Sequence, residues 1–143
     1  MCIRDSFKHI LAWLHKKISA KYSTEYISGD VAASKRTGIF SAFQKGDLQV
    51  LLAHPKCMAH GINLTAGHTI VWWAPINDFE IYDQANARVR RPGQKCHQNI
   101  IHLTGTYTKK GKTTMTIEDR LYKRLKQKDK IQGLLLDLLK TKV

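Results

Sequence analysis

Helical and strand-like segments alternate along most of this chain, and that alternation limits the folds open to it. Apolar residues at helical spacing predict helices over residues 7–21, 32–44 and 78–91, and from residue 116 onward. Continuous apolar runs predict strands at residues 25–27, 48–53, 69–73 and 99–103. Unbroken apolar strands are typical of parallel sheets that are covered on both faces. We therefore predict an α/β domain of three layers, with a mainly parallel sheet between helices.

The charge balance points to an anionic partner. The 143 residues include 24 lysines and arginines against 11 acidic residues, which gives a formal net charge of +13. This surplus favours nucleic acid, although solvated surface lysines explain part of it. No apolar run reaches the ~20 residues of a membrane span, and the apolar stretch at 10–14 is too short for a signal peptide. Cys2, Cys57 and Cys96 are therefore expected as free thiols in the cytoplasm.

Candidate functional residues are densest between positions 83 and 94. Gln84, Arg88 and Arg91 are spaced by four and three residues, so on a helix they share one face. Pro92 and Gly93 should end that helix. Two guanidinium groups beside a helix end are suited to a polyanion such as the phosphates of a nucleotide. In a basic protein, two such arginines can also be ordinary surface residues.

Several short motifs follow one another along the chain. They are Gly29, Arg36 and Phe43 before the 48–53 strand, His60-Gly61-Ile62-Asn63-Leu64 with Ala66 after it, Gln84-Ala85-x-x-Arg88-x-x-Arg91-x-Gly93-Gln94, and residues 116–119. In type and order they resemble the second RecA-like lobe of the superfamily 2 helicases, in their Swi/Snf-type branch. The resemblance covers residues 7–125, and the glutamine-arginine pattern, the family's sixth motif, is its most specific part. The His60 to Leu64 stretch resembles the fifth motif.

Two departures and one variant qualify this resemblance. Met58 and Ala59 stand where the Swi/Snf-type pattern has two glycines, and Pro92 is unusual within the sixth motif. The segments 54–56 and 82–88 are most similar to phage-type members of the family. That variant implies a bacterial or phage-infected cell as the setting.

The resemblance implies roles at a nucleotide site. Arg88 and Arg91 would be catalytic arginine fingers that reach the γ-phosphate of ATP across a cleft from another lobe. Gln84 would position the nucleotide, Gly61 would let its loop approach closely, and Asn63 would hydrogen-bond across the cleft. The Mg²⁺ ligands are expected on an N-terminal RecA-like lobe of the same full-length protein, and no metal site is expected within this chain.

DNA contact is the second role that the resemblance implies. Lys56 and His60 lie after the 48–53 strand, where the family has its DNA-facing loop, and Lys45 and the basic loop at 109–112 are further candidates. Such contacts go to the DNA backbone and are insensitive to sequence. A lysine in a basic protein is, however, more often simply a solvated surface residue.

Two other kinds of site fit the sequence less well. Gly111-Lys112-Thr113 resembles the end of a P-loop, but the first glycine of that motif would have to stand where Thr106 is. His54, Cys57 and His60 have the spacing of metal ligands, but no fourth ligand accompanies them for structural zinc.

These patterns divide the chain into three parts. Residues 1–6 make a poor strand and are taken as an uncertain or non-native start, so the first strand of the lobe is expected to be missing from this chain. Residues 7–130 form the helicase C-terminal lobe, and residues 131–143 form a C-terminal helical extension. The predicted function is the C-terminal lobe of an ATP-driven DNA helicase or translocase, inactive as an ATPase by itself. The alternatives are a stand-alone basic DNA-binding module and a small P-loop NTPase, which the misplaced glycine argues against.

Overall fold

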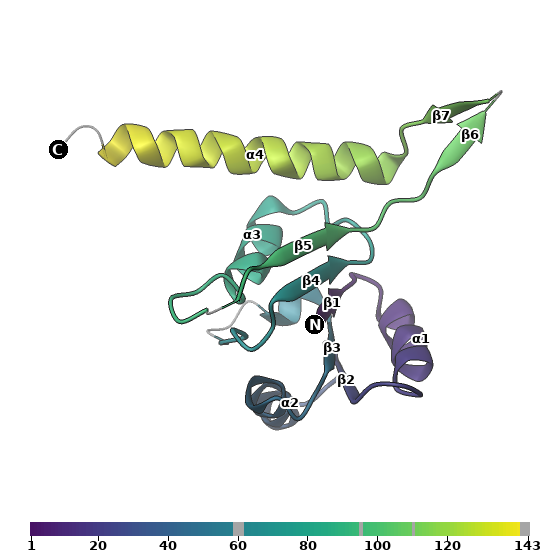
Figure 1. Cartoon of the computed structure of the whole chain (residues 1–143), viewed down its shortest axis with the longest axis vertical. Coiled ribbons are helices and arrows are strands. Elements are labelled where there is room, and N and C mark those ends of the chain that lie inside the picture. The colour runs from purple at the N-terminus through teal and green to yellow at the C-terminus, as the bar shows by residue number, and fades with distance from the viewer. Residues whose placement is uncertain (59–61, 95, 110, 141–143) are drawn as a thin grey trace.

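A five-stranded parallel sheet forms the centre of the molecule (Figure 1). The computed structural model describes residues 1–58, 62–94, 96–109 and 111–140. The strands are β1 (Cys2–Arg4), β2 (Thr24–Ile27), β3 (Val50–Ala53), β4 (Thr69–Trp72) and β5 (Asn99–His102). Their order in the sheet is β2-β3-β1-β4-β5, and every neighbouring pair is parallel. The predicted α/β class with a mainly parallel sheet is therefore confirmed.

Helices pack on both faces of this sheet. They are α1 (Lys8–Ile18), α2 (Ala33–Lys45), α3 (Phe79–Ala87) and α4 (Ile117–Lys140). On one face, α1 packs Leu11 and Leu14 against Leu52 of β3. On the other face, α2, α3 and α4 contribute buried residues to the same apolar cluster as Leu51 of β3. Successive residues of β3 thus face different layers, and this is why the strand is an unbroken apolar run.

Strand β1 lies in the middle of the sheet, where the sequence predicts no strand. Cys2, Ile3 and Arg4 pair with residues of β3 on one side and of β4 on the other. These two ladders satisfy the backbone, and pairing of this kind outweighs a weak intrinsic preference for strand. The buried Arg4 guanidinium donates from Nη1 to Asn86 Oδ1 at 2.9 Å and lies 5.5 Å from the centre of the Trp72 ring. The division of the chain at residues 6 and 130 stays a prediction.

A hairpin and a long helix follow the sheet (Figure 1). Strands β6 (Tyr107–Lys109) and β7 (Lys112–Thr114) pair antiparallel, where the sequence predicts a basic loop. A capping box opens α4, because Thr116 N and Oγ1 each donate to Asp119 Oδ2 at 2.9 Å and Asp119 N donates to Thr116 Oγ1 at 3.2 Å. The helix continues through Gly133 to Lys140.

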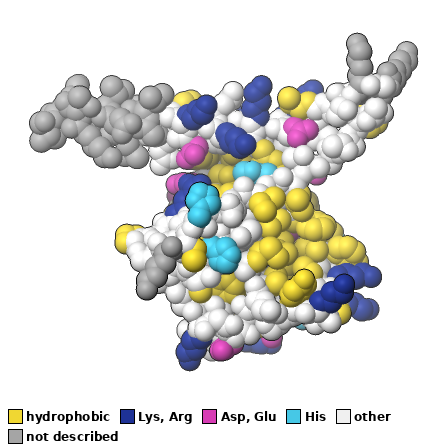
Figure 2. Space-filling model, in the orientation of Figure 1, with side chains coloured by type: hydrophobic (Ala, Val, Ile, Leu, Met, Phe, Trp, Pro, Cys, Tyr) yellow, Lys and Arg dark blue, Asp and Glu magenta, His cyan; other side chains and the backbone are white. Residues whose placement is uncertain are grey.

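Several large hydrophobic side chains remain at the surface. Trp13 of α1 is 51% exposed and lies 6.4 Å from Trp73, measured between ring centres. Figure 2 shows hydrophobic side chains gathered on the face of the molecule below the hairpin. No helix in the described part of the chain is long and apolar enough to cross a membrane. The three cysteines are free thiols: Cys2 is buried, Cys57 is partly buried and Cys96 is exposed.

Candidate functional site

The helix that begins the sixth motif is shorter than predicted. Asp78 caps α3, because its Oδ1 accepts a hydrogen bond from a backbone N–H of the first turn at 3.2 Å. The helix ends at Ala87, so the predicted end at Arg91 is wrong. Gln84 lies on the helix, Arg88 is its C-terminal cap, and Arg91 lies beyond it. The three side chains therefore do not share one helix face.

Two features end α3 before the second arginine. The carbonyl oxygen of Arg88 accepts a hydrogen bond from Leu64 N at 3.1 Å. Pro92 disfavours helical backbone in the residue before it, and Gly93 has a φ of +96°, a conformation that glycine adopts without strain. A contact with a distant part of the chain thus replaces the last helical turn, and the spacing of residues in the sequence does not reveal it.

Hydrogen bonds join the fifth-motif segment, described over residues 62–67, to the sixth-motif segment, residues 84–94. One is the backbone bond to the carbonyl that follows α3. The others come from the side chain of Gln94, whose Nε2 donates to the carbonyl oxygens of Thr65 and Gly67 at 3.0 Å each. The same Nε2 also lies 3.4 Å from the carbonyl oxygen of Val89, within the sixth-motif segment, so its two hydrogens are shared among three acceptors. The two segments are therefore held together as one unit.

Arg88 lies at the junction of these segments. Its Nε donates to the carbonyl oxygen of Met58 at 3.0 Å, which orients the guanidinium group. Burial lowers the pKa of Arg88, and the positive charge of Arg91 lowers it further. The two charges are thus close enough to repel each other, and an anion bound beside both would relieve that repulsion.

The residues predicted to bind ATP have different surroundings. Gln84 Nε2 donates to Glu80 Oε1 at 3.0 Å on its own helix. Asn63 Oδ1 accepts a hydrogen bond from Thr65 N at 3.2 Å, which shapes the fifth-motif segment from within. Gly61 lies outside the described residues.

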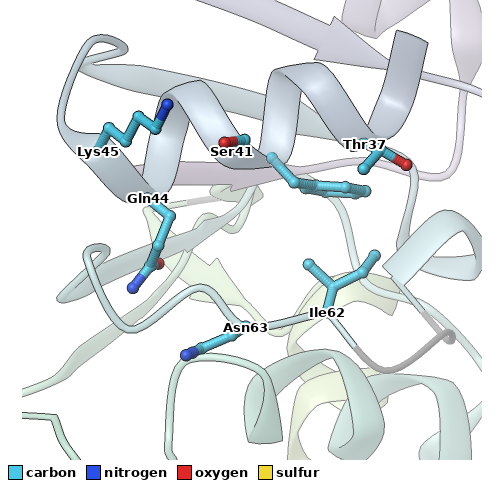
Figure 3. A pocket seen from close by; sticks show the side chains of 7 residues that line it. Thr37, Ser41, Gln44, Lys45, Ile62 and Asn63 are labelled. Atoms are coloured by element: carbon cyan, nitrogen blue, oxygen red, sulfur yellow. The ribbon is translucent and has the colours of Figure 1, made fainter. Parts of the chain in front are cut away.

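A cavity of about 490 Å³ lies between α2 and the fifth-motif segment (Figure 3). It is lined by Thr37, Phe40, Ser41, Gln44, Lys45, Ile62 and Asn63. Gln44 bridges the two sides, because its Nε2 donates to Thr65 Oγ1 at 2.9 Å and its Oε1 accepts from Ala66 N at 3.2 Å. The structure thus brings Lys45 and Asn63 to one cavity, although the sequence assigns the first to DNA and the second to ATP.

Lys56, another predicted DNA contact, lies in a different place. It is exposed on a short 3-10 helix, η1 (Pro55–Met58), that follows β3. It lines a second cavity, of about 460 Å³, together with Ser6, His54, Ile76, Asn77 and Asp78. Lys45 and Lys56 therefore line separate cavities, and His60 lies outside the described residues.

A buried polar residue that was not predicted from the sequence lies behind the site. Asn86 is 2% exposed, and its Oδ1 accepts hydrogen bonds from Trp72 Nε1 at 3.1 Å and from Arg4 Nη1 at 2.9 Å. A buried tryptophan N–H needs such a partner. The sequence does contain a sign of this role: Asn86 is a polar residue that follows Ala85, on the side of α3 that faces the core.

His102 occupies an aromatic cluster on the α4 side of the sheet. Its Nε2 lies 2.8 Å from Tyr82 OH, and its ring lies 4.2 Å from that of Tyr122, measured between centres. Burial, followed by the charge of Lys126, lowers the pKa of His102 to about 4. The structure thus gives this histidine a packing role. In the part of the chain that the structure describes, no group of three or more His, Cys, Asp or Glu side chains is arranged to hold a metal ion.

Comparisons with known proteins identify the family. The profile described as "Helicase conserved C-terminal domain" matches residues 3–93. The chain is 34% identical over 126 residues to the DNA repair and recombination protein RAD54B of Gallus gallus, which covers 84% of this chain and 12% of that protein. It is 31% identical over 121 residues to the chromatin-remodeling ATPase INO80 of Homo sapiens, which covers 81% of this chain and 7% of that protein. The chain therefore spans only a small part of these relatives.

A solved structure extends the similarity to three dimensions. The C-terminal part of the Fun30 ATPase domain matches with a TM-score of 0.72 and 22% sequence identity, covering 85% of this chain and 38% of that one. At this identity the match shows the fold, and it confirms the RecA-like architecture. The two relatives named above are animal proteins, and a phage-like origin stays a prediction. The profile match covers more than half of the chain, which therefore belongs to the helicase conserved C-terminal domain family, in the branch of the SNF2-type ATPases.

Proposed function

We propose that this chain is the C-terminal lobe of a two-lobed ATPase that moves along DNA, and that it supplies arginine side chains to the nucleotide site. One observation carries the proposal: hydrogen bonds join the fifth- and sixth-motif segments at Arg88, whose Nε is oriented by the carbonyl of Met58, and Arg91 follows three residues later. Two cations held together by the fold are suited to a polyanion. Because the chain spans 12% or less of RAD54B and INO80, the activity of the whole protein is part of this proposal.

The donor groups at this junction fit the phosphates of ATP. MgATP supplies the transferable phosphoryl group together with a metal that neutralises part of its charge. Arg88 and Arg91 would stabilise the negative charge that develops on the phosphoryl oxygens. The Met58 carbonyl orients the first arginine, and Gln94 fixes the loop that carries both. The Mg²⁺ ligands would come from the N-terminal lobe of the full-length protein.

The other predicted site residues divide between the two ligands. ATP contacts are assigned to Gly61, Asn63 and Gln84, and DNA-backbone contacts to Lys45, Lys56 and His60. Because Lys45 and Asn63 line the same cavity, the ATP and DNA surfaces adjoin on this lobe. Closure of the two lobes around ATP would then shift the DNA contacts of one lobe relative to those of the other.

ATP turnover by the full-length protein tests the arginine assignment. Changing Arg91 or Arg88 to alanine should lower DNA-stimulated turnover about 10³-fold or more, with DNA affinity nearly unchanged. Arg90→Ala is the matched control, since Arg90 is exposed in the same turn and its loss removes the same charge. Normal turnover in the Arg91→Ala protein would exclude this residue as a finger.

A second candidate function is a basic DNA-binding module without an ATPase role. The net charge of +13 favours it, because charge alone supports binding to the DNA backbone. The two candidates differ in the wild-type full-length protein. DNA binding without ATP hydrolysis at any DNA concentration would favour the module, and hydrolysis that depends on DNA would favour the motor.

A further inference from the structure

A hairpin projects from the lobe, away from the junction of the fifth- and sixth-motif segments. Strands β6 and β7 form a separate two-stranded sheet, and Figure 1 shows it extending beyond the end of β5. All of its side chains that the structure describes are exposed, and Tyr107 is 55% exposed. A two-stranded hairpin by itself is only marginally stable in water. Packing of these side chains against the lobe therefore does not explain why the chain forms this hairpin.

The composition of the hairpin is cationic and rich in hydroxyl groups. Residues 104–116 contain three lysines, six threonines and no acidic residue. The backbone register places Lys109 directly opposite Lys112, next to a turn in which Gly111 has a φ of +73°. Like charges at facing positions destabilise a hairpin. An anionic partner would offset this cost.

The base of the hairpin, by contrast, is fixed to the lobe. Gly105 N donates to Glu118 Oε2 in the first turn of α4 at 2.5 Å. The capping box holds Thr116, at the other end of the hairpin, to the same turn. Further along α4, the buried Tyr122 donates from its hydroxyl to Trp72 O at 3.3 Å. The lobe thus sets the direction in which the hairpin projects.

We propose that hairpin β6–β7 is a duplex-DNA contact that enters a groove and binds phosphates on its edges; this rests on the proposed function of the lobe. A two-stranded ribbon fits the major groove, which is about 12 Å wide. Lysine ammonium and threonine hydroxyl groups are common donors to phosphate oxygens, and the hairpin sequence supplies both.

Helix α4 continues the positive surface that starts at the hairpin. Its exposed cations are Arg120, Lys123, Arg124, Lys126, Lys128 and Lys130. Figure 2 shows Lys and Arg side chains along the described part of this helix, next to the hairpin. Over residues 117–132 these cations outnumber the three acidic residues, Glu118, Asp119 and Asp129, and together with the three lysines in the hairpin sequence they suit a partner with many phosphates.

DNA binding by the full chain tests this proposal. Lys109→Gln combined with Lys112→Gln removes two charges from the hairpin. Anisotropy of a labelled duplex should show about tenfold weaker binding at about 0.1 M salt. The slope of log Kd against log salt concentration should also fall by about two. Because such contacts ignore base sequence, the loss should be the same on duplexes of unrelated sequence.

A matched pair of lysines on another face is the control. Lys16→Gln combined with Lys17→Gln removes the same charge from exposed positions in the last turn of α1. This control should bind duplex DNA almost as the unchanged chain does. Equal weakening in both double variants would show a general charge effect and overturn the proposal, as would unchanged binding by the hairpin variant.

A tyrosine pair tests the hairpin independently of charge. Tyr107→Ala should weaken duplex binding, whereas Tyr22→Ala, which removes a tyrosine of 52% exposure after α1, should not. Urea unfolding should show that both variants keep the stability of the unchanged chain. Weakened binding to single strands alone, with duplex binding intact, would refute groove binding.

The full-length protein separates failure of this proposal from failure of the proposed function. The hairpin variant should need more DNA to reach half-maximal ATP turnover but keep the same maximum. Arg91→Ala should lose turnover at every DNA concentration. If the Arg91 variant is inactive and the hairpin variant is unchanged, only the hairpin proposal fails. If the hairpin variant binds poorly and the Arg91 variant stays active, only the arginine assignment fails.

Discussion

Gln94 holds the candidate site together through hydrogen bonds to two carbonyl groups, those of Thr65 and Gly67. Gln94→Ala leaves both carbonyls without this donor, so the free energy of unfolding should fall by about 1–3 kcal/mol. Urea unfolding of the full chain measures the change. Gln127→Ala, on the exposed side of α4, is the control and should change stability by less than about 0.5 kcal/mol. Equal stability of the two variants would contradict a structural role for Gln94.

His102 should make stability depend on pH. Burial and the charge of Lys126 lower its pKa from 6.5 to about 4. Between these two values the unfolded chain binds a proton that the folded chain excludes, so stability is full above about pH 6.5 and falls as the pH drops toward 4. We expect a loss of about 1 kcal/mol, because the side chain is partly exposed and water screens part of the effect.

The measurement for His102 is a comparison of pH profiles. Urea unfolding of the unchanged chain and of His102→Gln should give stabilities that differ in their pH dependence between about pH 6.5 and 4. The glutamine variant should have the flatter profile, because its side chain does not titrate. Parallel profiles would mean that another group, not His102, is responsible for the loss of stability in acid.

At this scale the sequence revealed which residue types gather in the sixth motif but not what they touch. The spacing of Gln84, Arg88 and Arg91 predicted a shared helix face, and the helix instead ends at Ala87. Pro92 and Gly93 contribute to this early end and are visible in the sequence, but the hydrogen bond from Leu64 to the carbonyl of Arg88 is not, because contacts between distant segments leave no trace in local spacing. The contacts of Asn86 with Arg4 and Trp72 also join distant segments, so they could not be predicted from its position in the sequence.

Among the elements, α4 depends on its capping box. Thr116→Ala removes the hydroxyl that accepts from Asp119 N and donates to its carboxylate. The free energy of unfolding should fall by about 1 kcal/mol, within a usual range of about 0.5–2 kcal/mol. Thermal unfolding measures it, because buried Tyr122 couples α4 to the lobe. Thr37→Ala is the control: this exposed hydroxyl bonds only within α2, and an equal effect there would contradict the capping role.

The elements that were predicted correctly have strong periodicity of their own. Strands β2 to β5 and helices α1, α2 and α4 lie close to their predicted positions. The elements that were missed are β1 and the hairpin of β6 and β7. Strand β1 is three residues long and is defined by its two neighbours in the sheet, and the strands of the hairpin consist of lysines and threonines with a single tyrosine. Neither has a local pattern that indicates a strand.

For the whole molecule, alternation of helices and apolar strands was sufficient to predict a covered parallel sheet. The order of the strands was not predictable, because it depends on which crossovers the chain makes and not on any one segment. The net charge of +13 correctly suggested a cationic surface but did not place it. The structure places Arg88 next to the fifth-motif segment and exposes six lysines and arginines along α4. The proposed nucleotide contact and the proposed hairpin contact would use these two groups of cations separately.

The cysteines give this lobe a natural position for a spectroscopic reporter. Cys2 is buried, and burial raises the pKa of the Cys57 thiol, so both react slowly with thiol reagents. Cys96 is exposed, and its backbone N–H donates to Gln94 Oε1 at 3.1 Å. A fluorophore that couples to thiols would therefore attach first at Cys96, two residues from the glutamine that links the fifth and sixth motifs. Such a label would test the proposed lobe closure in the full-length protein, as a change of emission when ATP is added.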